Sequence, residues 1–186
     1  MSHALIEQEL RSFHSHPTEK KYRWLRRFVI AEGNYDPRAT AVVALDSRVD
    51  ATDPVELLVE IERLPWFWQL CPRLHFVQAR VCEALGRKRR MLDSVALLQS
   101  CLHGLLATGN GSEDAPFAVT FLTDQRDLLR VIGEDLRYQQ LVRLDDRCCD
   151  VITSHAGNDV WFDVTELLKR LTVPVEAMDS RVGRFD

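Results

Sequence analysis

The feature of this sequence that most constrains its fold is a change in the spacing of its apolar residues near residue 107. Before that point apolar side chains recur every three to four residues, which is the spacing of amphipathic helices. Beyond it, Phe117, Val119 and Phe121 alternate with Ala118 and Thr120, as in a half-buried strand. We therefore predict an α+β chain, with a helical part over 1–108, a small α+β module over 109–172 and an irregular tail over 173–186.

The helical part contains clear start and stop signals. Asp36 and Asp53 each stand before a proline, an arrangement typical of a helix N-cap followed by the first helical residue. Pro72 begins a helix that stops at Gly86, and a second helix follows from about Arg90 to Ala107. Two amphipathic helices joined by a short glycine-containing turn have the shape of a tetratricopeptide-like hairpin, so we expect a tetratricopeptide-like helical bundle.

The segment TGNGSEDAP, residues 108–116, is rich in glycine and polar residues and predicts a turn between the two parts. Thr123 with Asp124 then predicts the N-cap and first turn of a short helix that Gly133 ends. Three β-rich stretches follow over 137–144, 148–154 and 160–164, separated by polar turn residues. We expect these stretches to form a small antiparallel sheet with one or two helices.

The stretches GNGSEDAPFAVTFLTDQRDLLRVIG, QQLVRLDDRCCDVI and DVWFDVTELL resemble a bacterial family of domains of unknown function. That family combines a tetratricopeptide-like segment with a β-α-β-β-β module carrying a GDG-x-S turn, a QSL strand and a YF-D-V strand. The positions that fit are Gly109, Gly111, Ser112, Phe117, Leu129, Gln140, Leu141, Asp150, Phe162, Asp163 and Val164. This chain departs from the pattern at Asn110, Gln139 and Ile132. The resemblance implies an architecture and no particular activity.

Composition argues against several classes of partner. The net charge is −4 and the isoelectric point is near 5.9, which gives no overall attraction to nucleic acid or to an anionic membrane. The basic run at 86–90 follows a helix end, where cations are favourable, and carries no nucleic-acid-reading motif. Five cysteines without a spacing framework favour free thiols. With no signal-like N-terminal segment, we expect a cytoplasmic protein without a nucleic-acid or membrane partner.

Two clusters could suggest chemistry. Cys148, Cys149 and His155 invite comparison with a Cys-His nucleophile, but neighbouring side chains on a strand point to opposite faces and His155 falls in a turn. We therefore interpret this stretch as a β-hairpin. The close pairs of candidate metal ligands are His14 with His16, and Cys71 with His75 one helical turn apart. Nothing in the sequence partners either pair, and two ligands do not close a zinc site. The sequence thus predicts no catalytic residues, no cofactor and no metal.

Aromatic residues provide the candidate partner surface. Trp66, Phe67 and Trp68 cannot all point inward, so they either plug the space between helical layers or leave one ring exposed. On the strand at 160–164, Trp161 and Asp163 lie on the face opposite Phe162.

The candidate surface is therefore Trp66, Trp68, Trp161 and Asp163. These patterns favour a non-enzymatic adaptor or scaffold that binds a protein or a second copy of itself. The alternative is a small enzyme or ligand-binding protein with a cleft between the helical and β parts.

Overall fold

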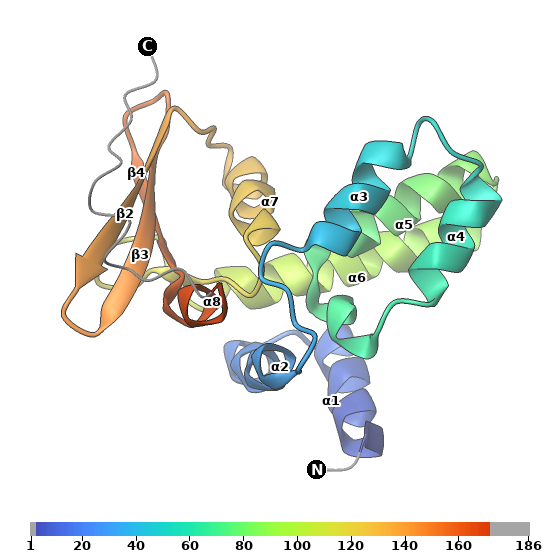
Figure 1. The fold of residues 1–186 in the computed structure, drawn as a ribbon, viewed down its shortest axis with the longest axis horizontal. Helices are drawn as coiled ribbons and strands as arrows, with labels where there is room; N and C mark the ends of the chain where they lie inside the picture. The colour runs from blue at the N-terminus through green and yellow to red at the C-terminus, as the bar shows by residue number, and fades with distance from the viewer. Residues whose placement is uncertain (1–2, 172–186) are drawn as a thin grey trace.

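The structure is a computed structural model that describes residues 3–171, and it places helices first and a sheet after them (Figure 1). The helices are α1 (His3–Ser15), α2 (Glu19–Ala31), α3 (Thr40–Arg48), α4 (Pro54–Glu62), the 3₁₀ helix η1 (Trp66–Leu70), α5 (Pro72–Ala84), α6 (Lys88–Leu106), α7 (Thr123–Ile132) and α8 (Thr165–Arg170). The strands are β1 (Phe117–Ala118), β2 (Tyr138–Leu144), β3 (Arg147–Thr153) and β4 (Asp159–Asp163). This is the predicted α+β arrangement; the predicted tail at 173–186 lies outside the described residues.

Several helix boundaries follow from the local sequence as predicted. The Asp53 carboxylate accepts the Val55 backbone N–H at 2.8 Å and so caps α4. Gly86, one residue beyond the C-cap of α5, and Gly133, directly after α7, adopt φ values of 67° and 75°, a conformation that glycine adopts without strain. The prediction of an N-cap was wrong at Thr123, which is the first residue of α7 after the N-cap Leu122, and at Asp36. The Asp36 carboxylate accepts the Arg38 and Thr40 N–H groups within a turn, so α3 begins at Thr40.

The sheet has the order β1-β4-β3-β2 and is mixed. β2, β3 and β4 are antiparallel neighbours, but β1 runs parallel to β4, which corrects the prediction of an antiparallel sheet. The strand expected around Phe117 is only two residues long. Its continuation is buried on both sides, because the Thr120 hydroxyl lies 2.7 Å from the Tyr22 hydroxyl and the Phe121 ring stacks on Trp68.

One hydrophobic core extends from the helices into the sheet module. Phe162, Val160 and Val164 are buried on the face of β4 that points into this core, as the strand alternation predicts. The helix α7 lies between the sheet and the α3–α6 helices (Figure 1). Its Asp127 forms a buried ion pair with Arg73 of α5. Within residues 3–171, no helix combines the length and the apolar character needed to cross a membrane.

Candidate functional site

The β3–β4 hairpin does not assemble a Cys-His pair. Cys149 is fully buried, and burial followed by the nearby Asp163 raises the pKa of its thiol to about 11. Cys149 pairs with Val142 near the Asp145–Asp146 turn, whereas His155 follows the opposite end of β3. At about 3.3 Å per residue the two residues are roughly 20 Å apart along the chain. The hairpin interpretation is thus consistent with the geometry.

The residues predicted to form a partner surface are all at least half-buried. Trp68 is only 4% exposed and its ring stacks on Phe121 at a centroid distance of 5.0 Å, so it is a core residue and its assignment to a partner surface was wrong. Trp66 is half-buried, and its indole N–H donates to Glu32 at 3.2 Å. Trp161 and Asp163 are half-buried on β4, and the Asp163 carboxylate accepts the Thr165 N–H at the start of α8.

A pocket of about 280 Å³ lies between α7 and the face of the sheet formed by β2 and β3. Its lining residues combine apolar side chains with amides and two charged groups: Leu122, Thr123, Gln125, Arg126, Leu136, Gln139, Asp150 and Ile152. The alternative prediction from the sequence was a cleft between the helical and β parts. This pocket instead lies within the second part, because the strand alternation places Gln139, Asp150 and Ile152 on the face that α7 covers.

Asp150 is the polar centre of this pocket. Its Oδ2 accepts hydrogen bonds from the side-chain amides of Gln125 at 2.8 Å and Gln139 at 3.0 Å. Burial raises the pKa of the Asp150 carboxyl, and the two amides oppose that shift. Among the described residues no donor reaches Oδ1. The pocket can therefore accept one more hydrogen-bond donor at this oxygen.

The strand β2 borders the pocket and forms an edge of the sheet. In the described part of the chain β3 is its one neighbour. Residues of an antiparallel strand direct their backbone groups alternately toward one neighbour and the other. The Cys148 N–H donates to the Thr165 hydroxyl, and the Cys148 C=O accepts the Val164 N–H, so both groups point away from β2. The partner of Cys148 on β2, Arg143, therefore points its own N–H and C=O to the open edge. The same alternation turns the backbone groups of Gln139 and Leu141 outward.

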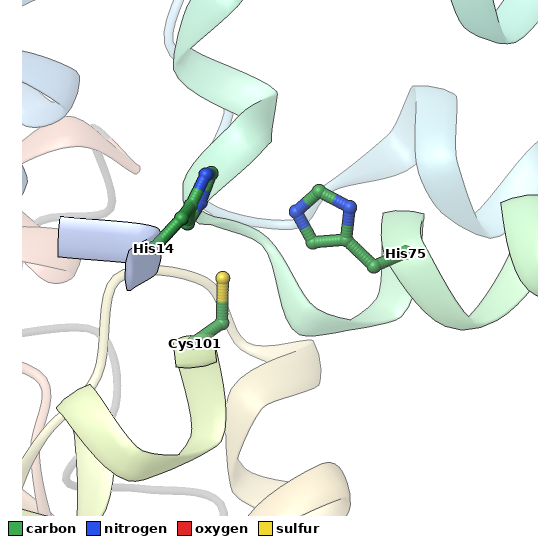
Figure 2. Close-up of side chains that lie close together, drawn as sticks. All are labelled: His14, His75 and Cys101. Atoms are coloured by element: carbon green, nitrogen blue, oxygen red, sulfur yellow. The ribbon is translucent and has the colours of Figure 1, made fainter. Parts of the chain in front are cut away.

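A second group of side chains lies in the helical part (Figure 2). His14 of α1, His75 of α5 and Cys101 of α6 each offer a ligand atom, and these atoms lie within 4.8 Å of one another. The Nε2 atoms of His14 and His75 lie 3.2 and 2.9 Å from the backbone carbonyl oxygen of Gln69, and Cys101 Sγ lies 3.5 Å from the same oxygen. Sequence spacing missed this cluster, because it pairs His75 with Cys101 and not with Cys71. The Cys71 thiol instead lies 3.9 Å from the Thr123 hydroxyl.

Comparison of the chain with protein-family models, with curated proteins and with solved structures finds no match. The resemblance to a bacterial family of unknown function therefore stays a prediction from the quoted motifs.

Proposed function

We propose that this protein is a non-enzymatic interaction protein that binds an extended segment of a partner protein along the open edge of β2. The observation that carries the proposal is that outward-facing backbone groups on β2 border the Asp150 pocket. Addition of a strand to a sheet edge is a common mode of peptide recognition, in which backbone hydrogen bonds supply affinity and side-chain pockets supply specificity.

The edge itself supports this mode. Exposed edge strands are usually blocked by charged side chains, prolines, bulges or short length. β2 is seven residues long, contains no proline and carries one charged side chain, Arg143. Tyr138, the first residue of β2, is 42% exposed and Leu136, two residues before the strand, is 40% exposed, so apolar surface is available beside the backbone groups.

The pocket indicates the chemistry of the partner. In an added strand, the residue opposite Gln139 has its side chain on the same face as Gln139, toward the pocket. An apolar stem can pack against Leu122 and Ile152, while a donor at its end reaches Asp150 Oδ1. A glutamine or lysine side chain meets both requirements. The proposed partner segment is therefore extended and carries an amide or basic residue at this position.

A displayed library of random peptides, selected on the full-length protein, tests this proposal. The binding of the selected peptides is then measured to wild type, to Arg143→Pro and to its matched control Arg143→Ala. Proline removes the outward N–H without removing a hydrogen bond to β3, because Arg143 faces the open edge. We expect Arg143→Pro to weaken binding about tenfold or more, since a net hydrogen bond contributes roughly 1 kcal/mol and the ring also obstructs pairing.

We expect Arg143→Ala to bind nearly as wild type, and Asp150→Asn to lower the preference for a basic residue. Selected peptides that bind wild type and Arg143→Pro equally would refute the edge mechanism.

A second candidate function, binding of a small ligand in the Asp150 pocket alone, is favoured by the accessible Oδ1. It predicts sensitivity to Asp150→Asn with no effect of Arg143→Pro.

A further inference from the structure

The cluster of His14, His75 and Cys101 plays no part in the proposed binding at β2. Its three side chains come from helices that are distant in sequence, and Figure 2 shows them converging on one point. His75 and Cys101 are fully buried and His14 is half-buried. Burial of two imidazoles and a thiol side by side is costly unless their polar atoms find partners.

The hydrogen bonding of this cluster is unbalanced. A backbone carbonyl oxygen has two lone pairs, but three groups lie within hydrogen-bond distance of the Gln69 oxygen: two ring nitrogens and one thiol. Each ring nitrogen can occupy that place only as a donor, which requires its proton to be on Nε2. A cation between the three side chains would accept the lone pairs of the two Nε2 atoms and of the sulfur. These atoms would then carry no proton, so they would no longer compete as donors for the Gln69 oxygen.

The donor set is that of a zinc-class ion. Two imidazole nitrogens and one thiolate are typical ligands, with bonds of about 2.0–2.1 Å to nitrogen and 2.3 Å to sulfur. Tetrahedral geometry with those bonds places the ligand atoms about 3.4–3.6 Å apart. The ligand atoms here lie within 4.8 Å of one another, so side-chain movements of about 1 Å bring them to the separations of a tetrahedral site. The fourth position falls to the Gln69 carbonyl oxygen or to water.

We propose that His14, His75 and Cys101 bind a divalent zinc-class ion that fixes α1 against α5 and α6. The position of His14 is already reinforced, because the Ser100 hydroxyl donates to the His14 carbonyl oxygen at 2.7 Å. Such an ion stabilises the folded chain in proportion to the logarithm of its free concentration.

The protonation states suit this role. Burial lowers the pKa of both histidines, that of His75 to about 4, so the imidazoles are neutral ligands at pH 7. Burial raises the pKa of the Cys101 thiol, so the ion replaces one proton on sulfur, and that proton leaves to solvent. The metal–thiolate unit carries one net positive charge, and the Asp124 carboxyl interacts electrostatically with Cys101 from nearby. Binding therefore releases one proton per ion.

Titration of the metal-free full-length protein with Co²⁺, followed by competition with Zn²⁺, tests the proposal. A thiolate-to-cobalt charge-transfer band reports Cys101 directly. The chain offers matched controls: His14→Ala against His16→Ala, which changes an exposed histidine two residues away, and Cys101→Ala against Cys82→Ala, which changes another buried cysteine.

We expect one ion per chain, with one proton released between pH 6 and 8. His14→Ala and Cys101→Ala should each weaken binding by more than about 100-fold, because each removes a ligand, and loss of a group that only hydrogen-bonds to a ligand already costs about 10–100-fold. Cys101→Ala should also abolish the charge-transfer band. His16→Ala and Cys82→Ala should bind as wild type. If Cys101→Ala does not fold, the comparison of His14→Ala with His16→Ala still tests the site, because His14 is only half-buried. Equal affinity of His14→Ala and His16→Ala, or no stoichiometric binding by wild type, would overturn the proposal.

The test is independent of the proposed interaction at β2. Arg143→Pro should bind Co²⁺ as wild type does, because β2 contributes nothing to the cluster.

Discussion

The structure makes a quantitative prediction about Asp124, a fully buried carboxyl in the first turn of α7. Its Oδ2 accepts the backbone N–H groups of Thr120 at 2.8 Å and Phe121 at 2.9 Å, while its Oδ1 is buried without a hydrogen-bond partner. Burial raises the pKa of this carboxyl from 3.8 to about 7, and the two N–H groups only partly oppose that shift. A rise of about three pKa units corresponds to about 4 kcal/mol at 1.36 kcal/mol per unit.

The sign of the effect follows from proton binding. The folded state keeps the Asp124 proton up to about pH 7, whereas the unfolded chain releases it near pH 3.8. Between these values the unfolded state binds fewer protons, so this group's contribution to the free energy of unfolding is largest below about pH 4 and falls as pH rises through 7. Asp124→Asn removes the titration and keeps an oxygen that can accept both N–H groups.

Urea unfolding of wild type and Asp124→Asn between pH 4 and 8 measures this contribution. The measured quantity is the difference between the two proteins in the free energy of unfolding at each pH. Asp127, with a pKa raised to about 6 by burial, and His75, with a pKa lowered to about 4, titrate in both proteins, so their effects largely cancel. We expect the difference to shift by about 4 kcal/mol in favour of Asp124→Asn as pH rises from 4 to 8. Asp145→Asn, which replaces an exposed carboxylate, is the control for the substitution itself and should change the free energy of unfolding by no more than about 0.5 kcal/mol. A difference for Asp124→Asn that stays constant within about 1 kcal/mol would refute the reasoning.

Three further predictions concern packing. Phe162→Ala should lower the free energy of unfolding by about 3–5 kcal/mol, because the phenyl ring is fully buried. Trp161→Ala should lower it by less and leave the sheet folded. Thermal unfolding compares the two variants, and a larger loss for Trp161→Ala would contradict the strand register. Gly104→Ala should destabilise by about 1–3 kcal/mol in urea unfolding, although alanine favours helices, because its Cβ would lie 2.7 Å from Phe13; a stabilised variant would contradict this. Cys149 should resist iodoacetamide at neutral pH in the folded protein, and labelling as fast as that of free cysteine, measured by mass spectrometry, would contradict its burial.

The sequence predicts the features of this fold that depend on local chemistry. Glycine in the left-handed conformation ends α5 and α7 where Gly86 and Gly133 stand, and the alternation around Phe162 identifies the face of β4 that enters the core. The three antiparallel strands follow from β-rich stretches separated by turn residues.

Features that depend on distant contacts were not predictable in this way. The parallel pairing of β1 with β4 joins segments more than 40 residues apart, and no local pattern encodes it. Asp124 looks like an ordinary first-turn acid, but the helices that cover α7 bury it. Local spacing pairs His14 with His16 and offers Cys101 no neighbouring ligand, because the packing of α1 and α6 is what brings His14 and Cys101 to His75.

Amide hydrogen exchange on β2 tests the proposed function most directly. It compares the free protein with its complex with the tightest-binding selected peptide. Gln139, Leu141 and Arg143 face the open edge, so we expect their N–H groups to exchange rapidly in the free protein and to become protected in the complex. Gln140 and Val142 point to β3 and should change little. Protection confined to other parts of the chain, with no change at these three amides, would contradict binding at the β2 edge.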